Sequence, residues 1–335
     1  MRFYDLSVAR SIINRRWAIA PRAACAAAAL AATLAAAGSC FAGLRITPLF
    51  GSSITSDPNA AIIESTINAA IGVYEQSFSN NISVSIAFGE MSSGLGQSST
   101  YYGSISYQQY RSALAADAVS AAAKEALASL PNQAGNPVNG NSSVDLTTAN
   151  LRALGFGFET PPTGQPDSTI DFNESIVNNS RTSINPSNYD LQAVISHEID
   201  EALGFGSALN GLANGAATPT GAVWAEDLFR YSAAGVRSFS TSLSAKAYFS
   251  YNGGTTDLAN FNQNAGGDYS DWSTGATPLV QDAFGTPGAI INPSVELTAL
   301  NVLGYQTNVP EPAALPLLLG GLGLLLPAKS RQRTR

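Results

Sequence analysis

Apolar positions recur along the first half of the chain with two different periods. From Asn59 to Gln76 they follow the 3.6-residue period of a helix, whereas residues 82–88 alternate strictly between apolar and polar, which is typical of a half-buried strand. A second alternating run at 168–176 predicts another strand, placed at the edge of its sheet, and the alanine-rich segment from Tyr107 to Leu130 predicts a long helix. We therefore expect an α+β fold.

The segment from Ser187 to Gly204 carries the clearest helical pattern. Ser187 is expected to cap its first turn, Asp190 stands three residues on, as in a capping box, and Gly204 is placed to end the helix. Six residues form its apolar face: Leu191, Val194, Ile195, Ile199, Ala202 and Leu203. Beyond Gly204 the chain is rich in glycine, which predicts loops until a short last helix from Pro293 to Leu303.

The polar face of this helix carries His197, which is the only histidine of the chain. Glu201 lies one turn further on, so both side chains are expected to point to the same side, away from the apolar face. Glu198 follows His197 directly and can reach the same space. An imidazole and a carboxylate at this spacing predict a metal site, for which zinc is the first choice and manganese or calcium are alternatives.

A third metal ligand is expected from acids that follow the helix. Asp227 and then Glu226 are the first and second choices, because both stand among apolar residues, and burying a carboxylate is costly unless it is paired or coordinated.

The sequence His197-Glu198-Ile199-Asp200-Glu201 resembles the HExxH helix of zincin metallopeptidases, with glutamate in place of the second histidine. Together with the Asp227-Leu228-Phe229-Arg230 segment and the C-terminal tail described below, it is similar to a family of exported bacterial proteins classed as metalloproteases. The resemblance implies a zincin-like fold over 43–309, two subdomains around the active-site helix, and hydrolysis of peptide bonds. His197, Glu201 and Asp227 would then hold zinc, and Glu198 would be the general base.

Other interpretations stay open at this stage. The histidine can be purely structural, or the fold can be a degenerate zincin that serves as a non-catalytic surface or extracellular-matrix protein. Ser207 stands where metzincins place a third histidine, which excludes a standard metzincin site. The segment 266–271 is a weaker candidate for calcium, and Tyr231 and Tyr248 are weaker candidates for polarising a substrate carbonyl.

Residues 1–42 have the three parts of a secretion signal. Five arginines precede an alanine- and leucine-rich run at 23–37, and small residues stand before Gly43 at the positions that a signal peptidase reads. A buried helix or a lipoprotein signal at Cys40 are the alternatives. We expect export of the protein with Gly43 as its first residue, which mass spectrometry of envelope protein can test.

Residues 310–335 resemble the PEP-CTERM sorting signal: a Pro-Glu-Pro motif at 310–312, a short apolar membrane segment and a basic end. This implies transient anchoring in the inner membrane, processing by an exosortase-type enzyme, and delivery to the outer surface or an exopolysaccharide matrix; a plain membrane anchor is the alternative.

The charge balance limits the partners of the remaining chain. Removal of both ends would take nine of the 17 basic residues but only two of the 24 acidic ones, which leaves a net charge of −14. So acidic a surface argues against nucleic acid as a partner. Both cysteines, Cys25 and Cys40, lie inside the predicted signal, so neither disulfides nor a cysteine-based zinc site are expected in 43–309.

Overall fold

The computed structural model describes residues 43–157 and 160–308. The predicted signal peptide at 1–42 and the predicted sorting tail at 310–335 lie outside these described residues. Within them, no helix has the length and apolar character needed to cross a membrane. The described chain mixes helices and strands, which confirms the prediction of α and β structure in one fold.

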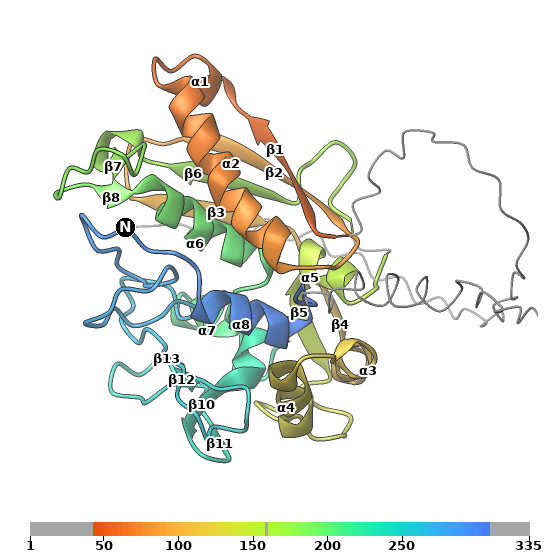
Figure 1. Cartoon of the computed structure of the whole chain (residues 1–335). Coiled ribbons are helices and arrows are strands. Elements are labelled where there is room, and N and C mark those ends of the chain that lie inside the picture. The colour runs from red at the N-terminus through yellow and green to blue at the C-terminus, as the bar shows by residue number, and fades with distance from the viewer. Residues whose placement is uncertain (1–42, 158–159, 309–335) are drawn as a thin grey trace, which may run out of the picture.

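A four-stranded sheet forms one end of the molecule, with strand order β1-β2-β6-β3 (Figure 1). The strands β1 (Arg45–Phe50), β2 (Ser83–Glu90) and β6 (Ser168–Phe172) run parallel, with Arg45 opposite Ser83 and Ile86 opposite Ser168. The fourth strand, β3 (Gly96–Thr100), lies at the edge and runs antiparallel to β6.

Two helices cover one face of this sheet, α2 (Ala60–Ser77) and α6 (Leu191–Leu203) (Figure 1). They pack against each other; α2 also contacts β1, while α6 contacts β3 and β6. The six apolar residues predicted to face the core from the second helix are all buried. Their packing against the sheet fixes α6, so its opposite face is presented to the space beside the edge strand.

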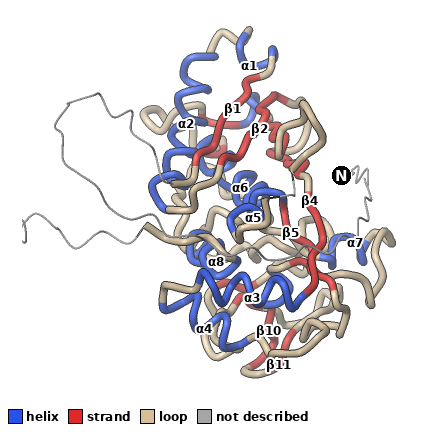
Figure 2. Tube along the Cα trace, turned by 90° about the vertical axis from the view of Figure 1, so that its right-hand side faces the viewer, coloured by secondary structure: helices blue, strands red, loops and turns tan. Residues whose placement is uncertain are grey.

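The rest of the chain builds the other end of the molecule from short elements. The strands β4 (Tyr102–Ser106), β5 (Ser143–Thr147) and β9 (Val223–Trp224) form a three-stranded sheet, in which β4 and β5 lie side by side (Figure 2). The helices α3 (Tyr107–Asp117) and α4 (Ala121–Ser129) lie at the same end as the strands β10 (Arg230–Ala233) and β11 (Val236–Arg237) (Figure 2). The last helix, α8 (Val295–Leu303), contacts both α4 and α6.

The remaining elements are short and mostly connect these layers. They are α1 (Ser52–Thr55), α5 (Thr148–Ala153), α7 (Ala208–Ala213), the 3₁₀ helices Glu174–Ile176 and Glu226–Phe229, the pair β7 (Val177–Asn178) and β8 (Tyr189–Asp190), and the sheet of β10 (Arg230–Ala233), β11 (Val236–Arg237), β12 (Tyr248–Phe249) and β13 (Ala259–Asn260).

Three expectations about these elements are wrong. The helix predicted from Tyr107 to Leu130 is two helices, because the Ser120 hydroxyl accepts the Ala123 N–H at 3.0 Å and caps a new start. The strand predicted at 168–176 ends at Phe172 and lies inside the sheet. The edge positions belong to β1 and β3, and the polar sequence of β3 gives little strand signal.

The start of α6 also differs from the prediction. Asp190 and not Ser187 is its N-cap, and its carboxylate accepts the Gln192 N–H at 3.3 Å. Arg181 donates to the same carboxylate at 2.9 Å, so the start of the helix is tied to the loop that precedes it. The helix ends at Gly204 as expected.

Candidate metal centre

Helix α6 presents His197 and Glu201 side by side, as the helical spacing predicts. The imidazole Nε2 lies 3.7 Å from Glu201 Oε1, and the two side chains keep 17% and 12% of their surface exposed. The other Glu201 oxygen accepts a hydrogen bond from the Ser98 hydroxyl on β3 at 2.6 Å. The edge strand therefore orients one carboxylate oxygen and leaves the other facing the imidazole.

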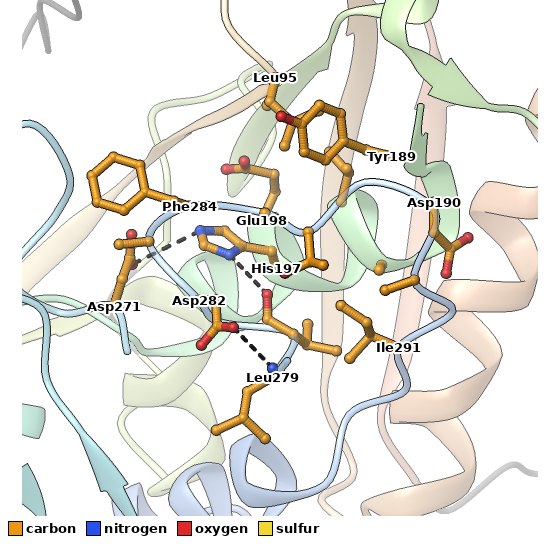
Figure 3. A pocket seen from close by; sticks show the side chains of 18 residues that line it. Leu95, Tyr189, Asp190, His197, Glu198, Asp271, Leu279, Asp282, Phe284 and Ile291 are labelled. Atoms are coloured by element: carbon orange, nitrogen blue, oxygen red, sulfur yellow. Dashed lines mark hydrogen bonds and ion pairs between the residues drawn. The ribbon is translucent and has the colours of Figure 1, made fainter. Parts of the chain in front are cut away.

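A backbone carbonyl orients the imidazole ring. His197 Nδ1 lies 3.0 Å from the Val280 carbonyl oxygen and donates its hydrogen to it, which turns the lone pair of Nε2 toward the carboxylates (Figure 3). This second hydrogen bond is the usual way in which a protein sets the tautomer of a metal-binding histidine.

Asp271 completes the group of donors. Its Oδ1 lies 3.8 Å from His197 Nε2, and one ligand atom from each of His197, Glu201 and Asp271 lies within 4.8 Å of the others. Asp271 is buried, and burial raises the pKa of its carboxyl well above the ordinary value, although the imidazole lowers it. A bound cation would relieve that cost, because it neutralises the buried charge.

The pKa values of the other two donors shift with the same cluster. Burial lowers the pKa of His197, but Asp271 and then the two neighbouring glutamates outweigh it, so the pKa is raised well above its usual value. Burial raises the pKa of Glu201, but the imidazole and the Ser98 hydroxyl outweigh it, so this pKa is lowered. Without metal, the group therefore favours a protonated imidazole beside an ionised Glu201.

The structure does not bring Asp227 to this group, so the expected third ligand needs correction. Its carboxylate is buried and accepts hydrogen bonds from the Ser207 hydroxyl at 2.5 Å and from the backbone N–H groups of Ala208 and Trp224, each at 3.0 Å. These bonds join the start of α7 to the turn after β9. These hydrogen bonds offset the cost of burying the Asp227 carboxylate, so its burial needs no metal ion.

Glu226, the second choice for that ligand, is placed in the same structural region. Its Oε2 accepts the Gly206 N–H at 2.9 Å, while Oε1 is buried without a hydrogen-bond partner. Burial raises the pKa of this carboxyl well above its ordinary value, which favours the neutral acid. Glu226 does not belong to the group of three donors around His197.

Glu198, the predicted general base, lies beside the three donors. It is 5% exposed, its carboxyl helps to lower the pKa of Glu201, and it lines the same pocket as His197 (Figure 3). Gly96 on β3 leaves the space, because a Cβ there would lie 2.4 Å from Glu198 Oε1.

A pocket of about 200 Å³ opens beside these residues. Its polar side chains come from His197, Glu198 and Asp271 together with Asp190, Asp282 and Thr286. The apolar lining comes from Leu95, Tyr189, Ala193, Val194, Leu279, Val280, Phe284, Ala289 and Ile291. Figure 3 shows Leu95 and Tyr189 on one side and Leu279 and Ile291 on the other. The pocket therefore has room for an apolar group next to polar side chains.

The weaker candidates lie elsewhere or change their role. Tyr231 and Tyr248 are buried in the β10–β12 sheet, the second donating to the Gly254 carbonyl at 2.6 Å, and neither lines the pocket. The Gly266–Asp271 segment contributes its last residue to the group around His197. The acidic, glycine-containing pattern of that segment could have pointed to Asp271, but it was interpreted as a separate calcium loop.

Gln281 is a further residue of the site, and no sequence pattern points to it. Its side chain is fully buried, and its amide nitrogen lies 3.2 Å from His197 Nε2 and 3.1 Å from Asp271 Oδ1. Its amide oxygen is buried without a hydrogen-bond partner. The donors present, one imidazole and two carboxylates with an unsatisfied amide oxygen beside them, are the chemical types that zinc and manganese accept.

Comparison with known proteins yields no relative: no protein family model, no curated protein and no solved structure matches this chain.

Proposed function

We propose that the protein is an exported metal-dependent endopeptidase with a zincin-like fold. The observation that carries the proposal is the convergence of His197, Glu201 and Asp271 beside a pocket that His197, Asp271 and Glu198 line. Zinc is the first choice of metal. When bound to these three donors, such an ion supplies Lewis-acid polarisation of a carbonyl and lowers the pKa of water.

Glu198 is the residue proposed to move the proton. Its carboxylate would accept a proton from the attacking water and pass it to the leaving amine, the two tasks of a general base and acid at one site. The missing side chain at Gly96 supports this role, because it leaves room for the Glu198 carboxylate at the pocket.

The edge strand supports a peptide as substrate. Among the described residues β3 pairs only with β6, so its other side presents backbone N–H and C=O groups next to the pocket. An extended peptide can bind such an edge as an added strand, with one apolar side chain in the pocket.

The proposal includes the setting inferred from the sequence. Export, cleavage by signal peptidase, processing of the tail by an exosortase-type enzyme and residence at the outer surface or in an exopolysaccharide matrix rest on the patterns in 1–42 and 310–335. The substrate would then be an extracellular peptide or protein.

The test compares Glu198→Gln with Glu125→Gln, an exposed glutamate on α4. Glu198→Gln is expected to retain stoichiometric metal by elemental analysis and to lose about 10²–10⁴ of the peptide-hydrolysis rate, because only the base is removed. Glu125→Gln should match the wild type. Wild-type protein that binds metal but cleaves no peptide would support the alternative of a non-catalytic surface protein, and release of metal by Glu198→Gln would make Glu198 a ligand.

A further inference from the structure

The main-chain N–H and C=O groups of Gln281 both form hydrogen bonds, which hold its loop in place. The Gln281 N–H donates to Glu296 Oε1 on α8 at 3.2 Å, and its carbonyl accepts the Trp272 N–H at 2.8 Å. Glu296 also accepts the indole N–H of Trp272 at 3.1 Å. One buried glutamate thus holds the segment of Gln281 against the segment of Asp271, which fixes the distance between these two side chains.

The amide group of Gln281 fills the space among the metal donors. Its nitrogen lies 3.2 Å from His197 Nε2 and donates to Asp271 Oδ1 at 3.1 Å, so the amide stands between the imidazole and the carboxylate in a buried site. The donation to Asp271 favours this orientation while no cation is present, because an amide oxygen in the same place would repel the carboxylate.

The distances around this amide match those between ligands of one small cation. Donors that lie about 2.1 Å from a tetrahedral metal are about 3.4 Å from one another. Around His197 Nε2 the separations are 3.7 Å to Glu201, 3.8 Å to Asp271 and 3.2 Å to the Gln281 amide. The amide therefore occupies the position of a fourth donor, although its nitrogen has no lone pair to give.

We propose that Gln281 is the fourth ligand of the centre and that metal binding turns its amide. A half-turn about the last side-chain bond exchanges nitrogen and oxygen and brings the oxygen, which has no hydrogen-bond partner, into the donor set. This inference rests on the proposed metal site. As the only neutral oxygen donor beside an imidazole and two carboxylates, the amide is the weakest of the four and the one that an incoming water or substrate displaces.

Three substitutions at this position separate ligation from packing. Gln281→Leu keeps a side chain of similar volume without a donor, Gln281→Asn keeps the amide but shortens it by one carbon, and Gln281→Glu keeps the length and supplies a carboxylate oxygen. The readouts are the dissociation constant of cobalt(II), the visible absorption of the bound ion, and the rise in melting temperature on adding it.

The expected result is that cobalt binds at least tenfold more weakly to Gln281→Leu and Gln281→Asn, with a changed spectrum and a smaller rise in melting temperature. Gln281→Glu should bind at least as tightly as the wild type. Equal affinity and an unchanged spectrum in the leucine variant would overturn the inference alone, leaving the peptidase proposal in place. Wild-type protein that binds no metal would overturn both. If the leucine variant does not fold, equal affinity in the asparagine variant refutes the ligand.

Discussion

Asp271 and Asp227 are two buried aspartates with different roles, and the same substitution in each tests the assignment of the third ligand. Asp271→Asn removes a negative donor from the group around His197, whereas Asp227→Asn changes a carboxylate that holds together α7 and the turn after β9. Both substitutions preserve side-chain volume, so differences between them report on chemistry at the two places.

The magnitudes follow from the contacts. Loss of residues that only support a metal ligand costs 10–100-fold in affinity, so loss of the Asp271 carboxylate should cost about 10²-fold or more. Its pKa is raised by burial, so a neutral amide there should leave the metal-free protein about as stable as before. In Asp227→Asn three hydrogen bonds lose their charged acceptor, and each loss lowers the free energy of unfolding by about 1 kcal/mol. The raised pKa of the Asp227 carboxyl reduces this sum, because burial already weakens the ionised form. We expect a loss of about 2 kcal/mol there, or roughly 4–8 °C in melting temperature.

Competition with a chelator measures the metal affinity, and thermal unfolding in the presence of that chelator measures the stability of the metal-free state. The reasoning is refuted if Asp227→Asn loses the metal while Asp271→Asn keeps it. In that case the ligand proposed from the sequence would be right and the geometry of the group around His197 would not describe the metal-bound protein.

Two other predictions concern the lining of the pocket. Gly96→Ala would place a Cβ 2.4 Å from Glu198 Oε1 and 2.9 Å from Val194 Cγ1, so it should lower the peptide-hydrolysis rate at least tenfold with metal content unchanged. The control is Gly157→Ala, where a Cβ meets open space and the rate should not change; equal rates in the two variants would contradict the role of the close approach. Burial raises the pKa of Asp282 from 3.8 to about 6, although the Leu279 N–H and His197 lower it, so its ionisation costs stability as the pH rises from about 4 through 6. Asp282→Asn should therefore melt at a higher temperature than the wild type at pH 8 and at the same temperature at pH 4, and an equal difference at both pH values would show that ionisation is not the cause.

The local part of the site follows from the sequence alone. A helix brings residues four apart to one side whatever surrounds it, so His197 and Glu201 meet once the apolar residues of α6 are known to face the core. The end of that helix at Gly204 and the strand at 83–90 follow from equally local patterns. What these patterns predict depends only on neighbours within one or two turns of the chain.

The remaining parts of the site were decided by the tertiary structure. Asp227 was expected to bind metal because it stands among apolar residues, and it is indeed buried. A buried acid can be stabilised by hydrogen bonds as well as by a cation, however, and only the path of the chain shows which of the two applies. Asp271 and Gln281 reach His197 through a loop-rich segment without periodicity, held in place by Glu296 on the last helix. The identity of the edge strand is likewise a property of sheet order, because a strand's own alternation reports which of its residues are buried and not which strands lie beside it.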